Sequence, residues 1–270
     1  MRPPMPESLA DPAALLASAI ETDRQYFELG ARLEQLPGAI LAWMPGLAAA
    51  PAGAVIQRVG AEVALAEESN WLFRAERALC GVGARTSRIY LDDGHDALDD
   101  LFRRAGYSKR EELIFAHSLN SPEPGLRMIP VESEFDWDRK LILQQSMPTP
   151  PDGHSTSAAD WIVLERRKCD AGMEMYLAEW DGQPVGAIGA IGGDGLLRLK
   201  NIAVHPSHRR KGVGLRMLGH LGILAKERGI SEQCVFAVRG EIGELLYRAA
   251  GMRMIGSVIE WSKPLGGSDR

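Results

Sequence analysis

The sequence has few cysteines, few aromatic residues, little net charge and no long apolar run. Only three of its 270 residues are cysteines, and no two of them form a CxxC pair, so neither a disulfide framework nor a zinc site is expected. No stretch approaches the ~18 apolar residues of a membrane span, and the N-terminal segment lacks the apolar core of a signal peptide. A net charge of −5 argues against a nucleic-acid-binding protein. We therefore expect a cytoplasmic protein with no membrane or nucleic-acid partner.

The overall composition is that of an ordinary globular protein, with 45% hydrophobic and 25% charged residues. Short strand-like runs are interleaved with helical periodicities, which predicts an α/β fold with a mixed α+β sheet flanked by helices. The first helix is expected over residues 12–35, where apolar residues recur at three- and four-residue steps until Pro37 and Gly38. In the second half, strands are expected at Glu174–Trp180 and Leu196–Val204.

Two segments rich in proline, glycine and small polar residues interrupt this pattern. Residues 118–125 (SLNSPEPG) contain two prolines and a glycine and little apolar material, which predicts a linker between one unit at 1–117 and another at 126–270. The second segment, Met147–Ser157, is expected to be a long mobile loop, and loops of this length inside a domain are often functional.

The two halves share a repeated segment. Residues 100–107 (DLFRRAGY) align with residues 245–252 (LLYRAAGM) at an offset of 145, from 247 minus 102. The strand-like runs before and after each segment keep the same offset. A helix that ends in Ala-Gly is a common C-cap, so this match alone could arise by chance. Because the register holds over three elements, we interpret the chain as two copies of one unit.

A basic glycine loop follows the strand that ends at Val204. The spacing Arg209-x-x-Gly212-x-Gly214 leads directly into an amphipathic helix. The start of a helix offers unpaired backbone N–H groups and the positive end of the helix dipole, which together bind anions. Glycines let a pyrophosphate approach those groups, and neighbouring Arg and Lys side chains add charge-assisted hydrogen bonds. A solvated basic turn that only caps the helix is the alternative.

In this combination of loop and repeated segment, residues ~124–265 resemble the GCN5-related N-acetyltransferase (GNAT) family. The Arg209–Gly214 run is similar to the family's acetyl-coenzyme A (acetyl-CoA) signature, R/Q-x-x-G-x-G/A. The resemblance implies that acetyl-CoA is the co-substrate. Its pyrophosphate would lie on the backbone of Lys211 to Leu215, and its pantetheine arm along Ile202–Val204. The cofactor-binding residues so implied are Ile202, Ala203, Val204, Arg209, Arg210, Lys211, Gly212, Val213, Gly214 and Leu215. No metal is expected, since His205 and His208 have no carboxylate or cysteine partner nearby in the sequence.

The resemblance also implies a general acid, and the need to deprotonate an amine suggests a general base. Tyr247 lies where many family members keep a tyrosine that returns a proton to the departing thiolate, although it could also serve only to pack the helix. An acidic residue typical of the strand Leu196–Val204 is absent here. Glu174 is therefore our candidate base, with Glu179 and Glu165 as the alternatives.

At the same offset, the first unit lacks this machinery. Ala64 stands in place of Arg209, Glu67 in place of Gly212, Ser69 in place of Gly214, and Phe102 in place of Tyr247. An acidic side chain at the pyrophosphate position would repel the ligand. We therefore expect the first unit to be a degenerate GNAT-like domain that acts as a scaffold, which either covers the sheet of the second unit or shapes its substrate cleft.

The function expected is transfer of an acetyl group from acetyl-CoA to the amine of a small molecule, by direct attack in a ternary complex. The loop Met147–Ser157 and the region Asp136–Gln145 are expected to line the acceptor site. Acetylation of a protein N-terminus or lysine is one alternative, and a non-catalytic acetyl-CoA sensor is another. The protein is expected to be a monomer or a homodimer.

Overall fold

The computed structural model describes residues 11–50, 52–67, 69–91, 98–118, 126–148, 156–193 and 195–266. The first half contains helices α1 (Pro12–Glu28), α2 (Ala61–Glu67), α3 (Ser69–Gly81) and α4 (Asp99–Arg104), and strands β1 (Arg32–Leu36), β2 (Ala39–Trp43), β3 (Ala54–Gln57), β4 (Thr86–Leu91) and β5 (Ser108–Ser118). The second half contains β6 (Arg127–Pro130), α5 (Glu134–Gln145), α6 (Ala158–Asp170), β7 (Glu174–Trp180), β8 (Gln183–Gly193), β9 (Leu196–Val204), the 3₁₀ turn η2 (Pro206–His208), α7 (Val213–Glu227), β10 (Glu232–Val238), α8 (Ile242–Ala249) and β11 (Arg253–Pro264). The predicted α/β class is confirmed.

Local signals set most of these boundaries, but the first helix is shorter than the sequence predicted. It ends at Glu28, and Gly30 follows with a φ of +68°. The rest of the predicted helix is β1, which forms a hairpin with β2. The sequence prediction of a helix to residue 35 was wrong because Leu33 fits the helical period as well as it fits a short edge strand.

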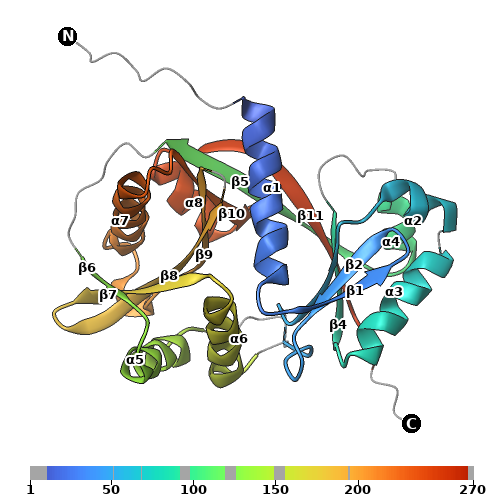
Figure 1. Ribbon diagram of the computed structural model, residues 1–270, viewed down its shortest axis with the longest axis horizontal. Helices are drawn as coiled ribbons and strands as arrows, with labels where there is room; N and C mark the ends of the chain where they lie inside the picture. The colour runs from blue at the N-terminus through green and yellow to red at the C-terminus, as the bar shows by residue number, and fades with distance from the viewer. Residues whose placement is uncertain are drawn as a thin grey trace.

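The eleven strands of the described residues belong to one sheet, in the order β1-β2-β3-β4-β11-β5-β10-β9-β8-β7-β6. Two strand pairs are parallel, β3 with β4 and β9 with β10, and the others are antiparallel. Helices α3, α4, α7 and α8 pack on one face of the sheet, through the cores around Trp71 and Met217. Helices α1, α5 and α6 pack on the other face, and α1 crosses the middle of the sheet in Figure 1.

The element positions repeat at the offset that the sequence indicated. Adding 145 to the bounds of α3 gives 214–226, and α7 covers Val213–Glu227. The same shift carries β5 to 253–263, where β11 covers Arg253–Pro264, and carries α1 to 157–173, where α6 covers Ala158–Asp170. Equivalent segments of the two halves therefore form equivalent elements.

The last strands of the two halves are exchanged. Strand β5 of the first half pairs with β10 of the second, from Glu232↔Ser118 to Val238↔Glu112. Strand β11 of the second half pairs with β4 of the first, and β5 and β11 pair with each other at the centre. The predicted boundary at 118–125, most of which lies outside the described residues, divides the chain but does not separate two independently paired sheets.

We expect a chain cut between residues 119 and 125 to stay whole. A protease site placed there leaves β5 on one fragment and both of its partner strands on the other. The two fragments should co-elute at the mass of the intact chain in size-exclusion chromatography and separate only in denaturant. Residues 126–270 made alone should aggregate, because β10 and β11 would each expose an unpaired edge. A soluble, monomeric 126–270 fragment with native-like circular dichroism would show that the exchange is dispensable.

Candidate active site

The parallel strands β9 and β10 separate part of the way along their length. They pair only at Glu232↔Leu196, Gln233↔Leu197 and Cys234↔Arg198, although β9 continues to Val204 and β10 to Val238. Backbone N–H and C=O groups on the two diverging edges are thus left without a strand partner at this position. We call this opening, between residues 199–204 and 235–238, the slot. An extended ligand can pair with its edges as an additional strand would.

A bulge in β9 shapes one side of the slot. The register with β8 shifts between Ala187↔Ala203 and Gly189↔Lys200, and Asn201 has a φ of +52°. Asparagine tolerates this left-handed conformation better than most residues. Both halves of the chain hold the side chain of Asn201. It accepts a hydrogen bond from the Tyr26 hydroxyl of the first half at 3.2 Å and donates one to Glu165 of the second half at 3.0 Å. Bulges of this kind re-aim a strand beside an active site.

Buried charges on the α1 face support the bulge. Glu165 is fully buried and pairs with Lys140 of α5 at 2.5 Å. Asp23 of α1 pairs with Arg198 at 2.9 Å and with Lys200 at 2.8 Å, and both of these partners lie on β9. Each buried charge therefore has a partner, which burial requires. The sequence had indicated only that an acidic residue typical of this strand is absent, and it gave no sign of the role of Asp23.

The basic glycine loop lies at the end of the slot. The loop is folded locally, since His205 Nδ1 accepts from the Ser207 N–H at 3.2 Å and Arg209 Nε donates to the Val204 carbonyl at 3.3 Å. His205 is thus a structural cap of η2. Within the described residues, no group of three or more His, Cys, Asp or Glu side chains could hold a metal ion.

The N-terminus of α7 is open to a ligand. Gly212 precedes the helix with a φ of +78°, and no side chain caps the first turn. The first N–H groups of α7 therefore point out of the helix at its positive end. Arg210 and Lys211 beside them are exposed. A Cβ on Gly214 would come within 3.0 Å of Leu246, so this glycine also permits the close approach of α7 to α8.

The ten predicted cofactor residues therefore gather at one place. Residues 202–204 are half-buried along the edge of the slot, residues 209–212 form the loop beyond it, and residues 213–215 form the first turn of α7. An anion at the loop and an extended arm along the strand edge would be continuous. The assignment of each of these residues to acetyl-CoA stays a prediction.

Tyr247 lies on α8, in the core cluster that also contains Val235 and Ala237 of β10. Its ring contacts Phe115 of the exchanged strand β5, with 5.9 Å between ring centroids. Burial raises the pKa of Tyr247 to about 12, so the hydroxyl stays protonated at neutral pH. A protonated phenol at this position can donate to an anion that forms nearby.

The three carboxylates that the sequence offered as a base are all bonded elsewhere. Glu174 forms a two-point ion pair with Arg228, at 2.5 and 2.9 Å, at the C-terminal end of α7. Helix α7 has 15 residues and is about 22 Å long, so Glu174 pairs with a residue at the opposite end of this helix from the glycine loop. Partial burial raises the pKa of Glu174, but the hydrogen bonds from Arg228 and Tyr176 outweigh this and leave it below its ordinary value. Glu179 pairs with Arg139 and Arg127, and Glu165 with Lys140. The geometry thus disfavours Glu174 as the base.

The equivalent place in the first half has a different structure. Adding 145 to the bounds of α2 gives 206–212, so a short helix replaces the glycine loop. Its backbone is engaged internally, as in the bond from the Ala64 N–H to the Gly60 carbonyl at 3.2 Å. Ala64, the counterpart of Arg209, is fully buried, and Phe102, the counterpart of Tyr247, stacks on Trp261. The Glu67 and Ser69 side chains lie outside the described part of the chain.

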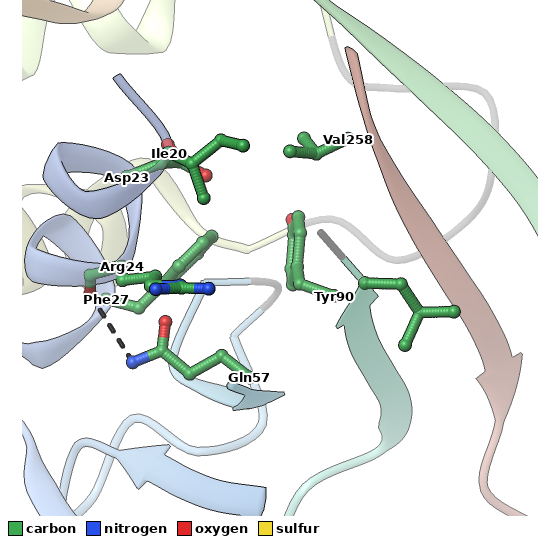
Figure 2. A pocket seen from close by; sticks show the side chains of 8 residues that line it. Ile20, Asp23, Arg24, Phe27, Gln57, Tyr90 and Val258 are labelled. Atoms are coloured by element: carbon green, nitrogen blue, oxygen red, sulfur yellow. Dashed lines mark hydrogen bonds between the residues drawn. The ribbon is translucent and has the colours of Figure 1, made fainter. Parts of the chain in front are cut away.

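The first half's parallel strands also diverge, but α1 fills the space beside them. Strands β3 and β4 pair only at Ile56↔Ile89. Figure 2 shows the cavity that remains between α1, β3, β4 and β11, with Phe27 and Tyr90 pointing toward each other. Its volume is about 10 Å³, room for about one water molecule. This part of the first half therefore has no space for a substrate.

Comparisons with known proteins agree with this geometry. Residues 171–251 match the family model of the acetyltransferase (GNAT) domain, and no curated protein sequence matches the chain. The fold is similar to that of a functionally unknown conserved protein from Staphylococcus epidermidis ATCC 12228, with a TM-score of 0.67 and 12% identity, over 87% of this chain and 95% of that one. It is also similar to a GCN5-related N-acetyltransferase from Kribbella flavida (TM-score 0.63, 15% identity, 95% and 97%). A tandem GNAT protein from the clavulanic acid biosynthesis pathway matches with a TM-score of 0.53 and 13% identity, over 86% and 79%.

The slot, the uncapped helix and the matched domain together define an acyltransferase. More specifically, the second half contains a domain of the GCN5-related N-acetyltransferase family, as its glycine loop had indicated. Enzymes of this family transfer an acetyl group from acetyl-CoA. In the part of the chain that the structure describes, no helix is long and apolar enough to cross a membrane.

We expect Gly212→Glu to abolish acetyl-CoA binding in isothermal titration calorimetry, because it places a carboxylate where the pyrophosphate would lie. Gly229→Glu is the matched control, since Gly229 also has a positive φ (+72°) and open space around it but follows the other end of α7. Both substitutions strain the backbone by about 1–2 kcal/mol. Equal acetyl-CoA affinity in the two variants would contradict this location of the pyrophosphate.

Proposed function

We propose that this protein acetylates the amine of a small molecule by direct attack on acetyl-CoA in a ternary complex. The observation that carries the proposal is the continuity of the slot with the uncapped, basic N-terminus of α7. Such a site binds an extended arm and a pyrophosphate together. The slot opens between β9 and β10. On the side of the sheet that α1 covers, these strands carry polar groups that are able to receive an amine.

The residues of the second half fit acetyl-CoA. Backbone N–H groups of residues 211–215 would hold the pyrophosphate, with charge from Arg210 and Lys211. Arg209, which bonds the Val204 carbonyl, would keep the loop against the end of the strand. The edge of residues 202–204 would pair with the pantetheine arm. Tyr247 would give its proton to the coenzyme A sulfur as the C–S bond breaks.

A small acceptor is favoured because the first half covers the acceptor face of the sheet. Helix α1 packs on β9, β10, β5 and β11 through Leu15, Ala19 and their neighbours, and it bonds to β9 through Asp23. Helices α5 and α6 pack on the neighbouring strands of the same face. This covering leaves little length for an extended peptide, which supports a small molecule over a protein substrate. All three cysteines are free thiols, in keeping with the cytoplasmic location that we also propose.

Acetyl-CoA should bind once per chain, since the first half has a helix in place of the loop. Calorimetry on the full-length protein should give one site. Thiol release with a panel of polyamines, amino sugars, aminoglycosides and amino acids should then identify the acceptor class, with N-terminal and lysine peptides as the comparison. Two acetyl-CoA molecules per chain, or turnover with peptides alone, would contradict the proposal.

Tyr247→Phe should lower kcat by roughly 10²-fold or more and leave acetyl-CoA affinity unchanged, because the hydroxyl would act only as charge develops on sulfur. Tyr107→Phe is the control. Tyr107 is also buried, but its hydroxyl bonds Ser87 and Glu76 on the α3 side of the first half. Thermal unfolding should report any loss of stability in either variant. Unaltered turnover in Tyr247→Phe would leave the residue a packing role only.

A further inference from the structure

The exchanged strand β5 brings a carboxylate of the first half beside β10, the strand that forms one edge of the second half's slot. Glu112 lies opposite Val238 of β10 on one side and opposite Val258 of β11 on the other. Residues two apart on a strand share a face, and Ile114 and Ala116 of β5 pack against α1. Glu112 therefore projects from the α1 face, beside the part of β10 that has already separated from β9.

The groups around Glu112 come from three other elements. Lys200 of β9, Asp23 of α1 and Glu260 of β11 act on it electrostatically, as does Arg110 of its own strand. Desolvation raises the pKa of Glu112 above its ordinary value; Lys200 and Arg110 counter this shift, and the two carboxylates add to it. A carboxylate whose pKa is raised is a stronger base than an ordinary one.

The other carboxylates here already have partners. Asp23 is bonded to Arg198 and Lys200, and Glu260 to Arg88 at 3.0 Å and to the Tyr90 hydroxyl at 2.8 Å. Within the described residues, no side chain forms a hydrogen bond or ion pair with Glu112. It is half-buried, so a solute can reach it. Of the carboxylates near the slot, Glu112 is thus the one that can receive a cation from outside.

We propose that Glu112 is a catalytic residue of the second half's active site, which binds the ammonium group of the acceptor and takes its proton. This inference rests on the proposed function and assigns the acceptor to the class of cationic amines. The free nitrogen attacks the thioester carbonyl, the C–N bond forms and the C–S bond breaks. The nitrogen loses a second proton when it becomes an amide. This proton replaces the one that Tyr247 gives to sulfur. The proton on Glu112 passes to solvent.

The first half then takes part in the chemistry. It supplies Glu112 through the exchanged strand, and it supplies the Tyr26 hydroxyl that holds the β9 bulge. The sequence predicted a scaffold that covers the second half's sheet or shapes its substrate cleft, and the strand exchange adds a chemical role to that prediction. The linear order of the chain places Glu112 135 residues before Tyr247, from 247 minus 112.

The test compares Glu112→Gln with Glu111→Gln in the full-length protein. Glu111 is the adjacent residue, but it projects from the opposite face and pairs with Arg239 at 2.5 and 2.8 Å. With the best amine of the panel, Glu112→Gln should lower kcat/KM by roughly 10²-fold with acetyl-CoA affinity unchanged, whereas Glu111→Gln should behave as wild type. In wild type, kcat/KM should fall as the pH drops through the raised pKa of Glu112. Glu112→Gln should lose this acidic limb, and Glu112→Asp should retain it. Full turnover and an unchanged pH profile in Glu112→Gln would overturn the inference.

A second measurement does not depend on turnover. Carbon-13 NMR of glutamate-carboxyl-labelled protein, with free coenzyme A bound, should contain one resonance that is missing from Glu112→Gln. That resonance should titrate above the ordinary glutamate range and shift on addition of spermidine as the probe. A wild-type protein that releases no thiol with any amine would refute the proposed function alone. A Glu112 resonance that spermidine leaves unmoved would refute this inference alone.

Discussion

The antiparallel pairing of β5 with β11 joins the two halves, and the rest of the structure depends on it. The ladder runs from Arg253↔Ala116 to Ser262↔Ser108, with a bulge between Met254 and Gly256. Each of these strands also completes the sheet of the other half. Removing either strand would leave edges exposed in both halves, so the two halves form one cooperative unit although their sequences are separate along the chain.

The same arrangement places charged groups where neither half alone could pair them. Asp23 belongs to the first half, and its partners Arg198 and Lys200 belong to the second. Breaking such a buried pair on one side leaves an uncompensated charge, which typically costs about 3–5 kcal/mol. These contacts fix α1 on β9 with little freedom, because ion pairs and hydrogen bonds are directional and apolar contacts are not. The position of the β9 bulge, and with it one edge of the slot, follows from that fixed contact.

The two halves differ most where a ligand would bind. Both have a parallel strand pair that diverges, followed by a helix at the same offset. In the second half, a loop with Gly212 at a positive φ leaves the N-terminus of α7 open. In the first half, α2 takes that place, and the residual cavity has room for little more than one water molecule. The same fold therefore leaves a site open to a ligand in the second half and covers the equivalent place in the first half. The difference is that a loop in the second half is replaced by a helix in the first.

The sequence by itself determined most of the elements, the repeat and the basic glycine loop. Periodicity and turn residues are local, so β7 and β9 were predicted with the bounds that the structure has, and the offset of 145 holds for helices and strands alike. The Arg209-x-x-Gly212-x-Gly214 spacing could be read because a phosphate loop is itself a local structure. The tertiary structure alone decided which strands pair. A strand at residues 108–118 has the same pattern whether it pairs within its own half or with the other, because a ladder needs only alternating side chains and free backbone groups. For that reason the sequence favoured Glu174, which lies in the second half but pairs with Arg228 at the far end of α7, and gave no reason to consider Glu112, which only the strand exchange places beside β10.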